Sequence, residues 1–160
     1  MIKVIVAIAS VLLALTPQPA GADPQKNCLQ QALYFEARGE GWRGMIAVGM
    51  VIKNRIASAE YPSSYCGVIR QGFYRNGTPI KNMCQFSFWC DGKPEEIDDE
   101  NAWQASGHLA DILMSTEITV EGIEKATHYH AFYVSPKWAK THMKMGKIGH
   151  HIFYRFASVN

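Results

Sequence analysis

The sequence has no concentration of charge of one sign. Its 160 residues carry 16 lysines and arginines against 14 aspartates and glutamates, a formal net charge of +2, and no run of basic residues occurs. Binding to nucleic acid needs a concentrated basic surface. The composition therefore argues against nucleic acid as the main partner, and the length fits one ordinary domain with no internal repeat or linker.

Several signatures of metal and nucleophile chemistry are also absent. The chain has no H-E-x-x-H, no C-x-x-C, no G-x-S-x-G, no nucleotide-binding loop and no papain-like cysteine segment. His128 and His130 would point from one face of a strand, and with His150 or His151 they could hold zinc. Because the usual ligand spacing is missing, we expect polar or packing histidines, no metal and no other cofactor.

A hydrophobic run long enough to span a bilayer is lacking too. In residues 1–22 the only charged side chain is Lys3, and the apolar run Val4–Leu15 is short for a hydrocarbon layer of about 30 Å. The small residues Ala20, Gly21 and Ala22 follow, at the positions that a signal peptidase recognises. We predict a signal peptide cleaved after Ala22, leaving residues 23–160 as one exported domain, in the periplasm, cell wall or medium, with no stable membrane anchor.

The cysteines are few but even in number: Cys28, Cys66, Cys84 and Cys90. In an exported chain four cysteines indicate two disulfides, with three possible connectivities. Cys84 and Cys90 bracket a short aromatic segment, which favours that pair and, by elimination, Cys28 with Cys66. The alternative is four buried free thiols, which an oxidising compartment disfavours.

The hydrophobic spacing predicts an α+β domain that is mostly helical and has a small β-element. Apolar residues at helical spacing predict helices, and alternating aromatic and β-branched residues predict strands. The expected helices are residues 28–37, 44–58, 62–69 and 98–115, and the expected strands are residues 127–134 and 148–156. Residues 72–83 read as a polar loop around an Asn76-Gly77 turn.

Two carboxylates four residues apart, Glu36 and Glu40, lie near the end of the first expected helix. If the helix continues that far, both lie on one face. Glu36 is flanked by Phe35 and Ala37, and partial desolvation would favour the neutral form that a general acid needs. The alternative is a solvated helix end in which Arg38 pairs with one of the two.

A second candidate lies inside the expected Cys84–Cys90 loop. Sugar rings pack on aromatic faces, and amide and hydroxyl groups bind their hydroxyls. We therefore expect a sugar-binding surface made of Gln85, Phe86, Ser87, Phe88 and Trp89. The alternative is that these rings fill a small core.

Taken in order, segments along nearly the whole chain after residue 22 resemble the SleB/CwlJ-type cell wall hydrolases. The resemblance is carried by E-A-R-G-E at residues 36–40, G-M-I-A-V-G at 44–49, V-I-K-N-R at 51–55, C-G-V-I at 66–69, C-Q-F-S-F at 84–88, C-D-G at 90–92, A-T-H-Y-H-A at 126–131, V-S-P-K-W-A at 134–139 and I-G-H-H-I-F-Y-R at 148–155. No single segment is decisive, but the ordered set is specific.

The resemblance implies a lysozyme-like, lytic-transglycosylase-like fold and cleavage of peptidoglycan between N-acetylmuramic acid and N-acetylglucosamine. The family's catalytic glutamate falls on Glu36, and Glu40 matches a second, supporting acidic position. Tyr129 and His130 join the aromatic loop as expected substrate-binding residues. The sequence has no added peptidoglycan-binding repeat, unlike the spore-germination members, so general wall remodelling is expected rather than cortex lysis.

The hypothesis for the reaction uses one acid. Glu36 would protonate the glycosidic oxygen and then, as a carboxylate, take a proton from the muramyl C6 hydroxyl, leaving a 1,6-anhydro end. A muramidase-type hydrolase would instead admit water, with Asp91 or Glu40 as a second carboxylate. Two other classes stay open: a metal-dependent amidase using His128, His130 and His150, and a non-catalytic glycan-binding protein.

Overall fold

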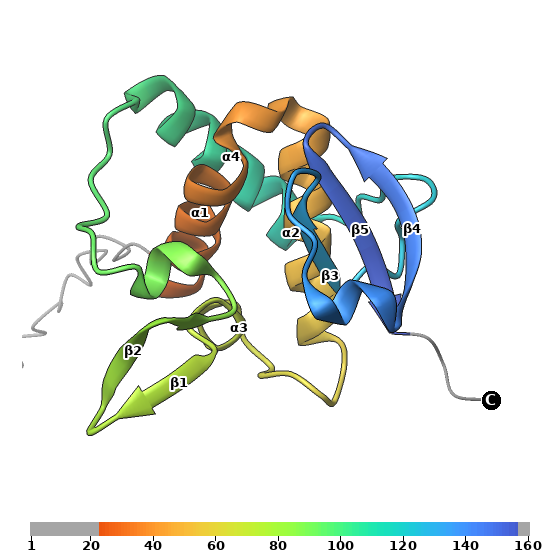
Figure 1. Cartoon of the computed structure of the whole chain (residues 1–160). Helices are drawn as coiled ribbons and strands as arrows, with labels where there is room; N and C mark the ends of the chain where they lie inside the picture. Colours follow the sequence, from red (N-terminus) through yellow and green to blue (C-terminus); the bar gives the residue numbers. More distant parts are fainter. Residues whose placement is uncertain (1–22, 157–160) are drawn as a thin grey trace, which may run out of the picture.

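Residues 23–156 are described by the computed structural model of the chain. The expected signal peptide, residues 1–22, lies outside the described residues. Among the described residues, no helix has the length and the apolar character that crossing a membrane would take. The expected α+β class is confirmed: helices are the more abundant element, and two small sheets accompany them (Figure 1).

Residues 23–156 contain four α-helices: α1 (Pro24–Ala37), α2 (Gly41–Ile56), α3 (Tyr65–Ile69) and α4 (Glu100–Ser115). Three of them begin after a residue whose side chain accepts a hydrogen bond from a backbone N–H of the first turn, namely Asp23, Ser64 and Asp99. The expected helix 62–69 is shorter than predicted because Ser64, rather than Pro62, is the capping residue.

Helix α2 is the centre of the molecule, and each of its faces belongs to a different core. Val48 and Ile52 pack with α1 and α4, whereas Ala47 and Val51 pack toward the sheet. Gly49 lets α4 approach closely, because a Cβ at this position would lie 2.4 Å from Leu113 Cδ1. Helix α2 therefore fixes how the helices and the sheet sit relative to each other (Figure 1).

The larger sheet is antiparallel, with strand order β3-β5-β4. Its strands are β3 (His128–Ala131), β4 (His142–Ile148) and β5 (His151–Phe156). The pairing of the two expected strands is confirmed by the β3–β5 register, but β3 ends at Ala131, earlier than predicted. Strand β4 was not predicted, because its burial does not alternate along the strand and its pairing is irregular between Lys144 and Gly146.

The expected polar loop 72–83 is wrong: the segment is a hairpin of β1 (Gly72–Arg75) and β2 (Thr78–Cys84). Asn76 and Gly77 both have positive φ, at 51° and 79°, as a tight hairpin turn requires. The two strands are mostly exposed, so the sequence has no alternating apolar pattern that would predict them. Among the described residues there are also three short 3-10 helices: η1 (Arg38–Glu40), η2 (Ser87–Cys90) and η3 (Lys137–Lys140).

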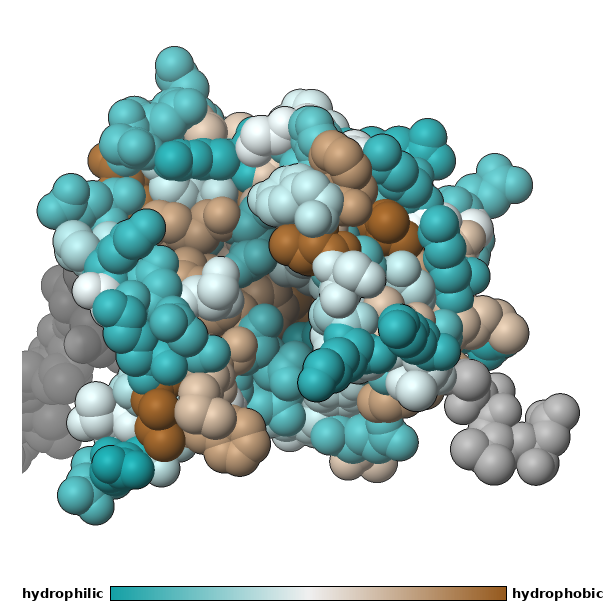
Figure 2. Space-filling model, viewed as in Figure 1, coloured by the Kyte–Doolittle hydropathy of each residue, from teal (hydrophilic) through white to brown (hydrophobic). Residues whose placement is uncertain are grey.

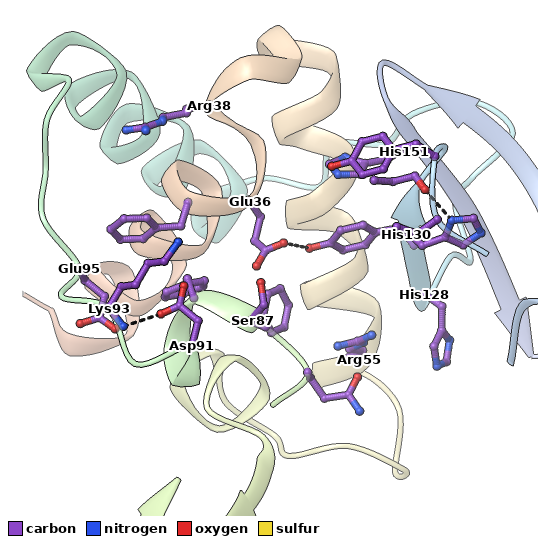
Figure 3. A pocket seen from close by; sticks show the side chains of 18 of the residues that line it. Glu36, Arg38, Arg55, Ser87, Asp91, Lys93, Glu95, His128, His130 and His151 are labelled. Atoms are coloured by element: carbon purple, nitrogen blue, oxygen red, sulfur yellow. Dashed lines mark hydrogen bonds between the residues drawn. The ribbon is translucent and has the colours of Figure 1, made fainter. Parts of the chain in front are cut away.

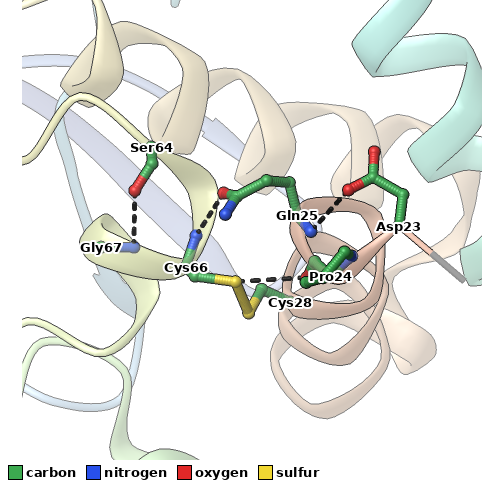
Figure 4. The surroundings of a disulfide bond; sticks show 7 residues. All are labelled: Asp23, Pro24, Gln25, Cys28, Ser64, Cys66 and Gly67. Carbon is green, nitrogen blue, oxygen red and sulfur yellow. Dashed lines mark hydrogen bonds between the residues drawn. A yellow bond between two sulfur atoms is a disulfide. The ribbon is translucent and has the colours of Figure 1, made fainter. Parts of the chain in front are cut away.

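Both disulfides of the favoured pairing are present. Cys28–Cys66 joins α1 to α3, and Cys84–Cys90 joins the end of β2 to η2. Beside the first bond, the backbone N–H of Cys66 donates to the side-chain oxygen of Gln25 at 3.1 Å (Figure 4). The two bonds therefore attach α3 and the hairpin to the helical part of the fold.

Candidate active site

A cleft of about 820 Å³ separates the helical part of the molecule from the three-stranded sheet (Figure 2). Its floor is formed by the end of α1 and by α2, one wall by residues 85–98, and the other wall by β3 and the connection that follows it. A cleft of this size accommodates small-molecule or sugar ligands. It is therefore the natural place to look for the predicted site residues.

Glu36 lies on the floor of this cleft, in the last turn of α1. The Tyr129 hydroxyl donates a hydrogen bond to Glu36 Oε2 at 3.1 Å (Figure 3). Burial raises the pKa of the Glu36 carboxyl above its ordinary 4.5, against the opposing hydrogen bonds and the positive charge of Arg55. A carboxyl group with a raised pKa keeps its proton closer to neutral pH, as a general acid must.

Glu40 does not share a face with Glu36, contrary to the conditional expectation. Helix α1 ends at Ala37, where φ is −141°, and the chain turns through η1 before Glu40. Glu40 instead accepts the backbone N–H of His150 at 2.7 Å, and its other oxygen lies 3.1 Å from His150 Nδ1. Partial burial works to raise the pKa of Glu40, but these His150 bonds and the nearby histidines outweigh it and lower the pKa.

Two glycines make room for Glu40. A Cβ on Gly149, which has a φ of +54°, would lie 2.0 Å from Glu40 Oε2, and one on Gly44 would lie 2.3 Å from Glu40 Cβ. Glu40 is not among the residues that line the cleft. Its carboxylate thus ties the start of α2 to the turn between β4 and β5, which holds the sheet against the helices.

Arg38 pairs with neither glutamate, so the alternative of a solvated Glu–Arg helix end is wrong. The Arg38 guanidinium pairs with Asp98, and the buried Tyr34 donates its hydroxyl to the same carboxylate at 2.6 Å. The backbone N–H of Asp99 also donates to the Tyr34 oxygen at 3.0 Å. These contacts attach the end of the 85–98 wall to α1, which fixes the width of the cleft beside Glu36.

The aromatic segment divides between the core and the cleft. Phe86 is fully buried, and Phe88 is buried and stacks on Phe35 with ring centroids 5.1 Å apart. Trp89 does not line the cleft; its ring N–H donates to the Tyr74 hydroxyl at 3.0 Å. Gln85 and Ser87 line the cleft and have accessible polar groups. The geometry therefore favours Gln85 and Ser87 as sugar contacts and gives no support to Phe86 or Trp89 as platforms.

Residues on the sheet wall were missed as site residues by sequence reasoning. Tyr133, 77% exposed, lines the cleft together with Val134 and Trp138. Val134 and Trp138 lie in a segment that the family resemblance already included, but nothing in the sequence showed which wall they would form. Only the course of the chain after β3 brings them opposite the 85–98 wall.

The histidines of β3 have partners of their own. His130 Nδ1 donates to the Ala131 carbonyl at 2.9 Å, and His130 Nε2 lies 3.0 Å from the Tyr154 hydroxyl. Burial, with Arg55 and His142 nearby, lowers the pKa of His128 to about 4. Within residues 23–156, no three histidine, cysteine, aspartate or glutamate side chains are grouped to hold a metal ion. The zinc alternative therefore has no ligand set in this part of the chain.

Comparison with known proteins gives a family match. The sequence model of the Cell Wall Hydrolase family matches residues 39–154. The spore cortex-lytic enzyme of Bacillus cereus is 29% identical over 125 residues, which is 78% of this chain and 42% of that protein. The spore cortex-lytic enzyme of Halalkalibacterium halodurans is 31% identical over 140 residues, 86% of this chain and 37% of that protein.

Two solved structures have the same fold. The catalytic domain of the Bacillus cereus SleB protein matches with a TM-score of 0.56 at 29% identity, over 86% of this chain and 94% of that one. The catalytic domain of the germination-specific lytic transglycosylase SleB of Bacillus anthracis matches with a TM-score of 0.58 at 28% identity, over 86% of this chain and 100% of that one. The expected lysozyme-like fold is thereby confirmed.

The extent of these matches matters for the site. This chain spans less than half the length of the curated relatives that it matches. The family match begins at Gly39, three residues after Glu36, so it does not itself include the proposed acid. The assignment of Glu36 therefore depends on the cleft geometry and on the E-A-R-G-E segment.

Proposed function

This chain belongs to the SleB/CwlJ-type cell wall hydrolase family, and from that premise we propose that it cleaves the glycan strands of peptidoglycan between N-acetylmuramic acid and N-acetylglucosamine. The observation that carries the proposal is the position of Glu36 on the floor of the cleft, where burial raises the pKa of its carboxyl group. Peptidoglycan lies outside the cytoplasm, so this activity requires an exported protein, in agreement with the predicted signal peptide.

The first step needs a proton on the glycosidic oxygen. Protonated Glu36 donates it as the C1–O bond breaks and positive charge develops at the anomeric centre. The leaving oxygen keeps the bonding electron pair and departs as a neutral hydroxyl. Glu36 becomes a carboxylate, and the Tyr129 hydroxyl and the positive charge of Arg55 both favour that charged form.

The second step in our proposal uses the substrate's own C6 hydroxyl. Glu36, now a carboxylate, takes the C6 hydroxyl proton while the C6 oxygen bonds to C1, giving a 1,6-anhydro end and restoring the acid. Such a reaction needs only one protein carboxylate. The similarity to a SleB domain described as a lytic transglycosylase supports this outcome.

The alternative is hydrolysis, in which water attacks C1 with help from a second carboxylate. Glu40 does not fit that role, because its carboxylate is bound to His150 and lies outside the cleft lining. Asp91 lines the cleft and is the remaining candidate of the two. The muramidase outcome thus depends on Asp91, whereas the transglycosylase outcome does not.

The biological setting that we propose is general remodelling of the wall. The relatives carry the name of spore cortex-lytic enzymes, so cortex peptidoglycan is the alternative substrate. The family match, residues 39–154, includes most of the residues that line the cleft, so the same glycan bond is the expected target. Cortex peptidoglycan and vegetative peptidoglycan can be compared directly as substrates.

Mass analysis of muropeptides released from purified peptidoglycan tests the proposal. We expect products with 1,6-anhydro ends, no products after Glu36→Gln substitution, and no effect of a chelator. Reducing ends that disappear in an Asp91→Asn variant would favour the hydrolase. Cut peptide stems that disappear with a chelator would favour the amidase, and binding without release would favour a glycan-binding protein.

A further inference from the structure

The hydrogen bond between β3 and the end of α1 suggests a specific role for Tyr129. We propose that Tyr129 is a positioning residue: its hydroxyl occupies Oε2 of Glu36, so that the acidic proton is carried by Oε1 and delivered from there to the glycosidic oxygen. This inference rests on the proposed function. It differs from the expected role of Tyr129 as a sugar contact, because Tyr129 acts here through Glu36.

The direction of the hydrogen bond follows from the surroundings of the hydroxyl. Among residues 23–156, the partner of the Tyr129 hydroxyl is Glu36 Oε2, at 3.1 Å. A buried hydroxyl proton without an acceptor is costly, so the proton points to that oxygen. Burial, together with the adjacent Glu36 charge, holds the pKa of Tyr129 well above 10. Tyr129 therefore stays protonated and donates in every state of the reaction.

This bond can persist through both chemical steps. When Glu36 is neutral with its proton on Oε1, Oε2 is a carbonyl-type oxygen that still accepts from Tyr129. After the proton leaves, the same bond becomes charge-assisted and stronger. Tyr129 therefore stabilises the carboxylate as its charge develops, which is where a fixed donor contributes most to the rate. No proton is gained or lost by Tyr129 in the cycle.

The fold holds the Tyr129 ring in this orientation. On β5, Phe153 is the register partner of Tyr129, with ring centroids 5.8 Å apart, and His151 meets the ring edge at 4.9 Å. Arg55 anchors the start of the strand, because its Nε donates to the Thr127 carbonyl at 2.7 Å. Helix α2 and strand β5 therefore both constrain the position of the hydroxyl.

Other charged or titratable groups also face this pair. Arg55 on α2 remains cationic throughout, and the Ser87 backbone N–H on the opposite wall is uncharged. His151 on β5 touches the Tyr129 ring, and burial lowers its pKa, so it is neutral at neutral pH. A shift of the pH profile on removing the Tyr129 hydroxyl would therefore report Glu36.

The test compares Tyr129→Phe with Tyr154→Phe. Both changes remove one hydrogen-bonded hydroxyl from neighbouring strands of the same sheet and keep the ring. For Tyr129→Phe we expect kcat to fall about 10- to 100-fold, the equivalent of losing a hydrogen bond to a charged group, with little change in KM. The alkaline limb of the pH–kcat/KM profile should move to higher pH, and Tyr154→Phe should keep the wild-type profile.

A second measurement does not depend on turnover. The carboxyl carbon of Glu36, assigned by its loss in Glu36→Gln, should titrate at higher pH in Tyr129→Phe than in wild type by carbon-13 NMR. In wild-type protein, the Tyr129 hydroxyl proton should shift with the same titration. This observation remains available if Tyr129→Phe proves too unstable, which thermal melts would reveal.

The outcomes separate this inference from the proposed function. A raised KM with an unmoved pH profile would make Tyr129 a sugar contact, and unchanged kcat, KM and Glu36 titration would make the hydroxyl purely structural; either overturns the inference. If wild-type protein releases no glycan fragments, the proposed function fails instead, and if Glu36→Gln keeps full cleavage, the assignment of Glu36 as the acid fails. The NMR titration would then still decide whether the hydroxyl controls the Glu36 proton.

Discussion

Glu36 and Glu40 are four residues apart, yet their carboxylates are bound by different parts of the sheet region, one by a strand and the other by a turn. Glu36 accepts the Tyr129 hydroxyl of β3, and Glu40 accepts the backbone N–H of His150 in the turn before β5. Burial raises the pKa of Glu36, whereas the His150 bonds prevail over burial and lower the pKa of Glu40. The two residues are therefore suited to different tasks, one to donate a proton and the other to hold the fold.

Glu36→Gln is predicted to lose glycan cleavage by at least about 10²–10⁴-fold, the usual contribution of a general acid. Glutamine keeps the shape and can still accept the Tyr129 hydroxyl, but it has no acidic proton. The measurement is the rate of muropeptide release from purified peptidoglycan, with folding checked by circular dichroism.

Glu40→Gln is the matched control for that substitution. Its activity should fall less, because the loss acts through the position of the β4–β5 turn. An active Glu36→Gln beside a dead Glu40→Gln would mean that the acid is the other carboxylate. If both variants stay active and a chelator stops the reaction, glycan cleavage itself is the wrong chemistry.

The same Glu36→Gln variant is predicted to be more stable than wild type at neutral pH. A carboxyl group whose pKa is raised by folding binds its proton more tightly in the folded state. Stability is then lost as pH rises from the unfolded pKa, near 4.5, through the folded pKa. Thermal melts of both proteins from pH 4 to 8 should converge at the acidic end and diverge above it. Parallel curves would contradict the raised pKa.

Gly149→Ala is predicted to destabilise the protein more than Gly122→Ala. Both glycines have positive φ, at 54° and 87°, so alanine costs about 1–2 kcal/mol of backbone strain at either site. Only at Gly149 would the new Cβ collide with Glu40 Oε2, whereas at Gly122 the space is open. Urea unfolding gives the difference. Equal losses of unfolding free energy would show that the Glu40 side chain can move aside without a cost in stability.

Tyr133→Ala is predicted to weaken binding to the glycan without weakening the fold. Its ring is exposed on the sheet wall of the cleft, and stacking of an aromatic face contributes about 0.5–1.5 kcal/mol. KM should therefore rise about 2- to 12-fold, since 1.4 kcal/mol is tenfold in affinity. Phe73→Ala removes another exposed ring, on the hairpin and outside the cleft lining, and should leave KM unchanged. A KM shared by both variants would remove Tyr133 from the site.

Replacing both Cys28 and Cys66 by alanine is predicted to cost about 2–4 kcal/mol of unfolding free energy. This disulfide closes a separation of 38 residues and attaches α3 to α1. The Cys84–Cys90 bond closes only 6, so its removal should cost less. Denaturant unfolding measures both losses. Peptide mapping without reductant that found free thiols or another pairing would contradict the assignment.

The parts of the fold that the sequence predicted are those with strong local patterns. Helices α1, α2 and α4 have apolar residues at helical spacing, and their side chains form the cores. The β1–β2 hairpin is mostly exposed and β4 is only partly buried, without alternation, so their side chains carry no comparable pattern. Backbone pairing with a neighbouring strand defines all three strands, and the Asn76-Gly77 turn joins β1 to β2.

The same contrast between local pattern and tertiary packing applies to the candidate site. Glu36 could be proposed from the helix end and the family resemblance, but its environment could not. The hydrogen bond between Tyr129 and Glu36 joins residues 93 apart in the sequence. The position of the Glu40 carboxylate depends on a turn 110 residues away. Whether Phe88 meets sugar or core was likewise decided by Phe35, on another element. Such relationships are properties of tertiary packing, which hydrophobic spacing along one segment does not encode.

The 93-residue span between Glu36 and Tyr129 also determines when, during synthesis, the proposed acid meets its hydrogen-bond partner. Glu36 is synthesised early, whereas the strand that covers it comes near the end. In a nascent chain that stops before β3, Glu36 lacks the Tyr129 hydroxyl and part of the burial that raises its pKa. The proposed acid therefore acquires its surroundings only when nearly the whole domain has been synthesised.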